Sequence, residues 1–122
     1  MKTIYHTIVT NIGDLFNAFV DEKILIMFKD NAPEELLDYC VLHNKNSLNG
    51  DILAGDILVI GSEEYLITAV GEDAVENLDN LGHITIKFDG SNAAKLPGTI
   101  YVQDKTIQAV EVGTEIKVIR KS

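Results

Sequence analysis

His43 is the residue whose type and position offer the clearest chemistry in this sequence. It ends the largely apolar run 39–43 and is followed at once by Asn44, Lys45 and Asn46. An imidazole nitrogen is nucleophilic at neutral pH, and a phosphorylated imidazole is a reactive donor once it is positioned. The amides and the lysine of the next loop could hold an anion such as a phosphoryl group. The spacing alone also fits an ordinary histidine at a strand end, so both interpretations stay open.

Two further histidines lie in runs of alternating polarity. His83 begins a run in which it shares the polar face with Thr85 and Lys87. If that face borders the loop after His43, His83 could donate a hydrogen bond to bound phosphoryl oxygens, whereas the pattern alone indicates a surface histidine. His6 lies between apolar neighbours, where a packed histidine is typical, and we assign it no role.

Cys40 is the only cysteine, and it is expected to be a core residue. In an extended run, Cys40 and His43 point to opposite faces, so one metal ion could not easily bind both. A cysteine among apolar neighbours also has a raised pKa, which disfavours a catalytic thiol. The glycines stand at turn spacing and form no nucleotide fingerprint, so we expect no metal and no nucleotide cofactor.

The elements that must position these residues are mostly short strands. Runs rich in β-branched and aromatic residues, closed by Gly, Asp or Asn, predict seven or eight strands. They cover residues 3–10, 23–28, 39–43, 56–60, 64–70, 83–88, 99–102 and 115–120. The turn 61–63 predicts an antiparallel hairpin of 56–60 with 64–70.

Two segments carry helix signals instead. Asn31 as a cap, with Pro33 early in the first turn and acidic residues after it, predicts a short helix reaching Leu37. Residues 72–81 have apolar residues at helical spacing and end at Gly82. Strands this short and numerous need closure, so we predict an all-β fold, a compact, largely antiparallel barrel or barrel-like sandwich, in one domain over residues 1–122.

The net charge and the lengths of the apolar runs make some partners and locations less favourable than others. The net charge is −9, with 19 acidic and 10 basic residues, which disfavours nucleic acid and anionic lipid as partners. The same charge fits a basic protein partner, or simply solubility. No apolar run approaches the roughly 20 residues that span a bilayer, and the N-terminus lacks a signal-peptide pattern, so we expect a cytoplasmic protein.

Several segments, taken together and in order, resemble the glucitol/sorbitol-specific IIA component of the phosphoenolpyruvate-dependent sugar phosphotransferase system. They are Tyr39-Cys40-Val41-Leu42-His43, Tyr65-Leu66-Ile67-Thr68-Ala69-Val70-Gly71, Asn77-Leu78-Asp79-Asn80-Leu81-Gly82-His83-Ile84-Thr85, Phe88-Asp89-Gly90 and Pro97-Gly98-Thr99. The resemblance covers essentially the whole chain and implies a largely antiparallel β barrel.

The resemblance also implies a function and its partners. Proteins of this kind accept a phosphoryl group from the phosphocarrier HPr on a histidine that matches His43. They pass it to a cysteine of the IIB component, which phosphorylates the hexitol entering through the membrane component IIC. His83 matches a second, supporting histidine. Lys45 stands where a further histidine is expected, which leaves His43 as the only candidate in its loop.

Two other hypotheses remain at this stage. One is a non-catalytic regulatory module that phosphorylation switches. The other is a β-barrel ligand binder in which His43 is incidental. The phosphocarrier hypothesis expects the imidazole of His43 to be accessible to solvent.

Overall fold

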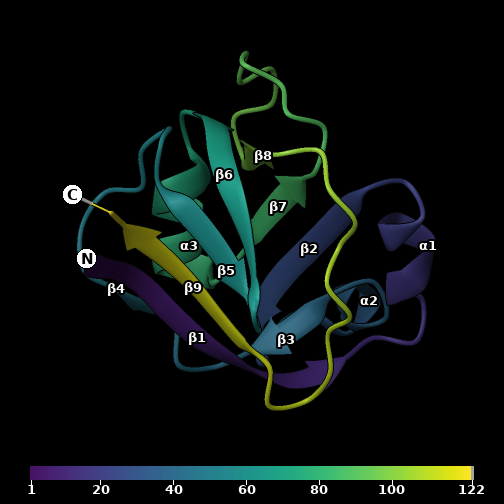
Figure 1. Ribbon diagram of the computed structural model, residues 1–122. Coiled ribbons are helices and arrows are strands. Elements are labelled where there is room, and N and C mark those ends of the chain that lie inside the picture. Colours follow the sequence, from purple (N-terminus) through teal and green to yellow (C-terminus); the bar gives the residue numbers. More distant parts are fainter. Residues whose placement is uncertain (122) are drawn as a thin grey trace.

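The computed structural model describes residues 1–121, and strands dominate it (Figure 1). The strands are β1 (Lys2–Ile12), β2 (Ile24–Lys29), β3 (Val41–His43), β4 (Ser47–Leu48), β5 (Ile57–Ile60), β6 (Glu63–Val70), β7 (Ile84–Lys87), β8 (Thr99–Val102) and β9 (Glu115–Arg120). The helices are α1 (Phe16–Val20), α2 (Glu34–Leu37) and α3 (Ala74–Leu81).

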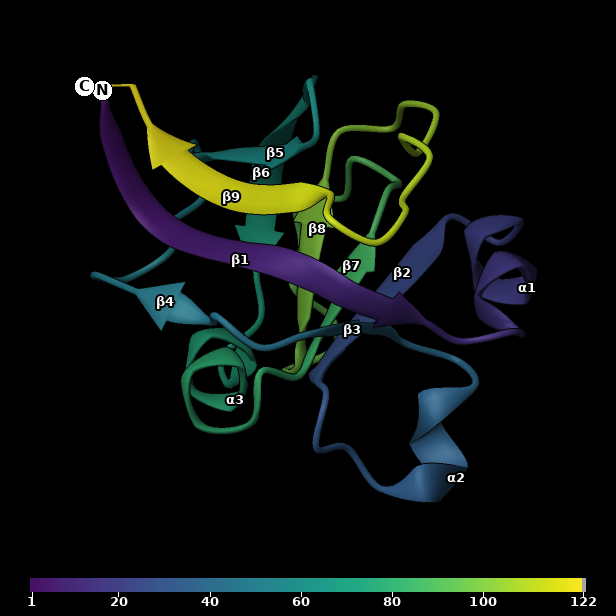
Figure 2. The same ribbon diagram turned by 90° about the horizontal axis from the view of Figure 1, so that it is seen from below.

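Eight of these strands close into a barrel. The hydrogen-bonded order is β3-β2-β7-β8-β6-β5-β9-β1, and a further pairing of β1 with β3 completes the ring. Only β2–β3 and β7–β8 are parallel among these pairings. Strand β4 pairs with β1 outside the ring, as the view from below shows (Figure 2). The predicted all-β, largely antiparallel barrel is therefore confirmed, and closure leaves its main strands without free edges.

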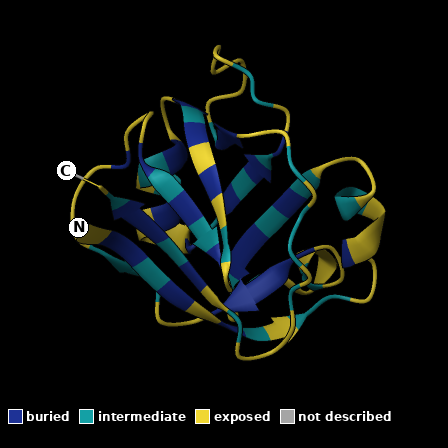
Figure 3. Ribbon diagram, in the orientation of Figure 1, coloured by how far each residue is buried: buried dark blue, intermediate teal, exposed yellow. Residues whose placement is uncertain are grey.

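The barrel interior holds the hydrophobic core. Along most strands, buried residues alternate with more exposed ones, as expected when one face lines a core (Figure 3). Strand β8 is buried at every position. The completely buried side chains in this core include Ile4, Leu25, Val41, Ile60 and Phe88. A second cluster, formed by Phe28, Cys40 and Leu42, lies outside this core, and Leu37 of α2 packs against it.

The predicted strands all occur, and the predicted hairpin is present. Ile57 of β5 pairs with Leu66 of β6, and Ile60 pairs with Glu63. Strand β4 and helix α1 were not predicted. Strand β4 has only two residues within a polar loop, and α1 has five residues without a side-chain cap, so neither carries a periodic signal.

The two predicted helices are shorter than their sequence signals. Helix α2 has Pro33, rather than Asn31, at its N-cap position. Helix α3 begins at Ala74 and ends at Gly82, whose φ of 65° is left-handed. Glycine adopts this conformation without the steric cost that a Cβ atom imposes, which explains why the helix stops there. The end of α3 leads directly into β7, beside the end of β3.

Candidate functional site

His43 is the last residue of β3, inside the barrel wall. Its main chain pairs with Val9 of β1 on one side and with Lys29 of β2 on the other. The residue is 0% exposed. The expectation of a solvent-accessible imidazole is therefore wrong for the conformation described here.

The alternation along β3 explains this burial. Val41 belongs to the barrel core, whereas Leu42 belongs to the outer cluster with Phe28 and Cys40. Because successive side chains of a strand point to opposite faces, His43 points to the same side as Val41. The ring of His43 is thus directed toward the interior of the barrel.

Both ring nitrogens of His43 are hydrogen-bonded to neutral groups. Nε2 lies 2.8 Å from the carbonyl oxygen of Gly82, and Nδ1 lies 2.8 Å from Oγ1 of Thr7. A carbonyl oxygen only accepts, so Nε2 carries the proton and donates it. Thr7 Oγ1 accepts the backbone N–H of Asn46 at 3.0 Å and donates its own hydrogen to Nδ1. These partners select the neutral Nε2–H tautomer.

The surroundings of His43 also favour the neutral ring. Burial lowers the pKa of His43 below its ordinary value of 6.5, and the positive charge of Lys29 lowers it further. The hydrogen bond to Gly82 and the negative charge of Asp30 oppose this shift, and the net direction is downward. His43 is therefore an uncharged imidazole near neutral pH, which is the nucleophilic form.

The cover over the Nε2 side of His43 consists of Gly82 and the side chain of Lys29. A Cβ atom added at Gly82 would lie 3.1 Å from His43 Cε1 and would overlap Cγ of Lys29. The residue at the end of α3 must therefore be small as well as left-handed. The end of α3 and the flexible side chain of Lys29 therefore meet beside this edge of the ring.

We predict that Gly82→Ala destabilises the protein by more than about 1–2 kcal/mol, because contact with Lys29 and His43 adds to the usual cost of a left-handed L-residue. Urea denaturation of the variant and the parent measures the difference. Gly113→Ala is a suitable control, because Gly113 also has a positive φ but has open space where a Cβ would lie. A Gly82→Ala loss no larger than that of the control would show that contact with Lys29 and His43 adds nothing to the strain.

The loop after His43 divides into an exposed part and an anchored part. Asn44 and Lys45 are exposed. Asn46 has φ of 42°, its Oδ1 accepts from Tyr5 Oη at 2.7 Å, and its Nδ2 donates to the Leu78 carbonyl at 2.9 Å. The side chain of Asn46 therefore connects β1 to α3 through these two hydrogen bonds. Asn44 and Lys45 are the loop residues that face solvent.

His83 follows Gly82 directly and lies against the outer cluster. Its ring stacks on Phe28 with centroids 4.7 Å apart and planes at 22°. The residue is half-buried, and burial lowers its pKa. His83 therefore adjoins the residue that holds His43 Nε2. Among residues 1–121 there is no hydrogen bond between the two imidazoles.

Comparison with known proteins identifies the family of this chain. The sequence profile of the family described as "PTS system glucitol/sorbitol-specific IIA component" matches residues 4–117. The chain belongs to this family. Two relatives named "PTS system glucitol/sorbitol-specific EIIA component", from Shigella flexneri and Escherichia coli K12, are each 37% identical to it over 117 residues. Those alignments cover 96% of this chain and 95% of each relative.

A solved structure supports the fold of this IIA chain. It is that of the PTS system IIA component from Enterococcus faecalis V583, which is 27% identical and superposes with a TM-score of 0.80. The superposition covers 93% of this chain and 98% of that chain. The barrel around His43 is thus the fold of a IIA component.

Cys40 of this IIA chain is buried in the outer hydrophobic cluster with Phe28 and Leu42. It is 2% exposed, and burial raises the pKa of its thiol to about 11. A thiol of that pKa is protonated at neutral pH and is therefore a poor nucleophile. The sequence-based interpretation of Cys40 as part of the core is confirmed.

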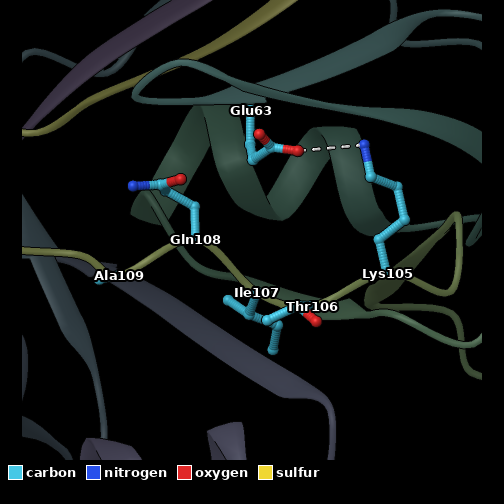
Figure 4. A pocket seen from close by; sticks show the side chains of 6 residues that line it. All are labelled: Glu63, Lys105, Thr106, Ile107, Gln108 and Ala109. Atoms are coloured by element: carbon cyan, nitrogen blue, oxygen red, sulfur yellow. Dashed lines mark ion pairs between the residues drawn. The ribbon is translucent and has the colours of Figure 1, made fainter.

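One surface pocket of this IIA chain lies away from His43. A surface pocket of about 540 Å³ runs beside residues 105–109, where Lys105 pairs with Glu63 at 3.3 Å (Figure 4). Neither His43 nor His83 lines it. The space inside the core, lined by residues such as Tyr5 and Leu78, amounts to only about 10 Å³. That is about the volume of one water probe, so this space is too small for a small-molecule ligand.

The helices of this IIA chain are all short. None in residues 1–121 is both long and apolar enough to cross a membrane.

The sequence reasoning missed Thr7 and Gly82, the two residues that hold the His43 ring. Thr7 lies on one face of β1 between the buried residues Tyr5 and Val9, and it is itself 0% exposed. A polar residue in an otherwise buried face is a signal that the sequence contains. Recognising it required knowing which face of β1 turns inward.

Proposed function

We propose that this IIA chain is a cytoplasmic phosphocarrier. His43 accepts a phosphoryl group from phospho-HPr and passes it to the IIB component during glucitol/sorbitol uptake. The observation that carries the proposal is the state of the His43 ring, which is neutral and hydrogen-bonded to neutral groups at both nitrogens. A neutral imidazole keeps the lone pair that a phosphoryl acceptor needs.

The burial of His43 adds a requirement to this proposal. A ring that is 0% exposed cannot meet a phosphoryl donor, so the Gly82 carbonyl must move away before transfer. Helix ends and side chains of this kind open locally at much smaller cost than the barrel unfolds. Because Gly82 and Lys29 cover the Nε2 side, Nε2 is the nitrogen that such an opening exposes.

The transfer itself needs no cofactor. Once Nε2 has lost its proton and Nδ1 holds one, the Nε2 lone pair attacks phosphorus in line with the leaving nitrogen. The phosphorus–nitrogen bond of phospho-HPr breaks, and its electron pair stays on the nitrogen of HPr. The chain supplies mainly orientation and electrostatic stabilisation.

Charged and polar groups lie near His43, and the acidic Asp30 is among them. Lys29 is close enough to His43 to affect its pKa, and Lys45 and Asn44 are exposed in the adjoining loop. We assign Asn44 and Lys45 to contacts with the phosphoryl oxygens. Asn46 contributes by holding the loop in place.

Reconstitution tests the proposal. The protein is incubated with phosphoenolpyruvate, enzyme I and HPr, and the expected product carries one acid-labile, base-stable phosphoryl group per chain. A second incubation with the IIB component should remove the group. A protein that takes no label from active HPr would contradict the phosphocarrier function and favour the two binding hypotheses, the regulatory module and the ligand binder.

We predict that His83→Ala slows phosphoryl acceptance by about 10- to 100-fold, as expected when a donor to developing charge is removed. The measurement is the initial rate of labelling from phospho-HPr. His6→Ala is the matched control, because His6 pairs with Glu115 on β9 at 2.8 Å and lies outside the site. Equal rates for the two variants would remove the supporting role of His83.

A further inference from the structure

Thr7 is a buried polar residue with a direct bond to the proposed phosphoryl carrier. It is 0% exposed, lies in β1, and places Oγ1 2.8 Å from His43 Nδ1. We infer that Thr7 is the positioning residue for phosphoryl transfer, because its hydroxyl holds Nδ1 and thereby fixes the orientation of the ring in which Nε2 meets the phosphoryl donor. This inference rests on the proposed function of His43.

The oxygen of Thr7 is itself fixed in position. It accepts the backbone N–H of Asn46 at 3.0 Å. Asn46 is held in turn by Tyr5 at 2.7 Å and by the carbonyl of Leu78 at 2.9 Å. Burial raises the pKa of Tyr5, so its phenol stays protonated and remains a donor. A chain of hydrogen bonds therefore connects β1, the loop after β3 and α3 to Nδ1 of the imidazole.

A hydroxyl suits this position because it can both donate and accept. In the closed conformation Nε2 holds the ring proton, and Thr7 donates to Nδ1. Attack by Nε2 requires the proton on Nδ1, and Thr7 must then accept from Nδ1–H. Rotation of the hydroxyl about the Cβ–Oγ1 bond of Thr7 makes this change without moving the oxygen. A backbone carbonyl could only accept, and a backbone N–H could only donate.

The proton count balances through this change. The opening must admit water to both edges of the ring: Nε2 gives its proton to water and Nδ1 takes one from water before Thr7 accepts from Nδ1–H, so the ring stays neutral. The Nε2 lone pair then forms the bond to phosphorus, and the HPr nitrogen leaves with the electron pair of the broken bond. Nδ1–H remains hydrogen-bonded to Thr7 throughout the transfer.

Thr10 offers a matched control on the same strand. Its hydroxyl is buried, and within residues 1–121 it has no hydrogen-bond partner. Thr7→Val and Thr10→Val make the same chemical change, the loss of one buried hydroxyl with little change in shape. Only the first removes a contact with His43.

The experiment measures the rate of labelling by phospho-HPr and the 15N chemical shifts of the His43 ring. Thr7→Val is expected to slow acceptance about tenfold, the effect of losing one hydrogen bond of roughly 1.4 kcal/mol. It is also expected to shift the 15N resonance of His43 Nδ1, which loses the hydrogen bond donated by Thr7. Thr7→Ser, which keeps a hydroxyl, should restore most of the rate, and Thr10→Val should match the parent in both measurements. Thermal unfolding verifies that each variant is folded.

The outcomes separate this inference from the proposed function. If the parent is labelled but Thr7→Val retains the parent rate and the parent 15N shifts, Thr7 does not position the ring and the phosphocarrier function stands. A slow Thr7→Val that Thr7→Ser does not rescue would also overturn the inference, because the hydroxyl would then be irrelevant. A parent that takes no label overturns the proposed function, and the inference with it.

Discussion

Replacing His43 with alanine is expected to abolish phosphoryl labelling by phosphoenolpyruvate, enzyme I and HPr. The reason is direct, because the imidazole nitrogen is the only proposed point of attachment, and its lone pair forms the new bond to phosphorus. The measurement is label retained by the protein after electrophoresis under alkaline conditions, in which a phosphohistidine survives. No signal above background is expected for the variant.

A second variant separates chemistry from folding. His43→Ala leaves a cavity and removes the partners of Thr7 and Gly82, so it also lowers stability. His43→Gln retains an amide that can donate toward the Gly82 carbonyl and cannot carry a stable phosphoryl group. Both variants should be unlabelled, while His6→Ala should be labelled at the parent rate. Persistent label in both His43 variants would place the carrier elsewhere in the chain.

The second large effect, a loss of stability, is expected at an ion pair. It joins Asp56, the residue before β5, to Arg120 of β9. Asp56 is 3% exposed, and its carboxylate accepts from Arg120 through two hydrogen bonds of 2.8 and 2.9 Å and from the Leu53 N–H at 2.9 Å. Asp56→Asn replaces the charged acceptor with an amide. We expect the free energy of unfolding to fall by about 2–3 kcal/mol, as for buried hydrogen bonds to charged groups. Urea denaturation measures it.

The same ion pair makes stability depend on acid pH. The hydrogen bond from Arg120 lowers the pKa of Asp56 from its ordinary value of 3.8, although burial opposes the shift. Because the carboxylate is a stronger acid in the folded state, its contribution is complete above the unfolded pKa and is lost as the pH falls below about 3.8. The asparagine variant should lack this part of the acid dependence.

A matched exposed carboxylate provides the control. Glu64 pairs with Lys121 at 3.0 Å, and both side chains are at least half exposed. Glu64→Gln makes the same change from carboxylate to amide and should cost less than about 1 kcal/mol. Equal losses for Asp56→Asn and Glu64→Gln would show that burial and the two additional hydrogen bonds of Asp56 add nothing.

The hydrophobic pattern was sufficient to predict most of the strands. Short apolar runs closed by turn residues marked every strand of the barrel, because each strand buries at least one face. The pattern could not show which strands are neighbours. The pairing of β1 with β3, which closes the barrel, joins residues 9–12 to 41–43, and the parallel pairs β2–β3 and β7–β8 leave no local sequence signal.

At the site, too, the sequence predicted the residue types but not their surroundings. The sequence identified the family and singled out His43 and His83 as the chemically capable residues, because the type and order of residues are enough for both. It could not predict the burial of His43, since Val41 and Leu42 are both apolar and both buried, one in the barrel core and one in the outer cluster. Alternation therefore did not reveal which face of β3 points inward.

The partners of the imidazole were decided by tertiary structure alone. Thr7, Asn46 and Gly82 are separated by tens of residues along the chain and meet only because β1, β3 and α3 pack together. Hydrogen bonds of this kind depend on distances of about 3 Å between atoms, which no local pattern of residue types encodes. The sequence by itself determined that His43 has a nucleophilic side chain. The packing of the barrel determined that Thr7 holds Nδ1 and that the Gly82 carbonyl accepts from Nε2.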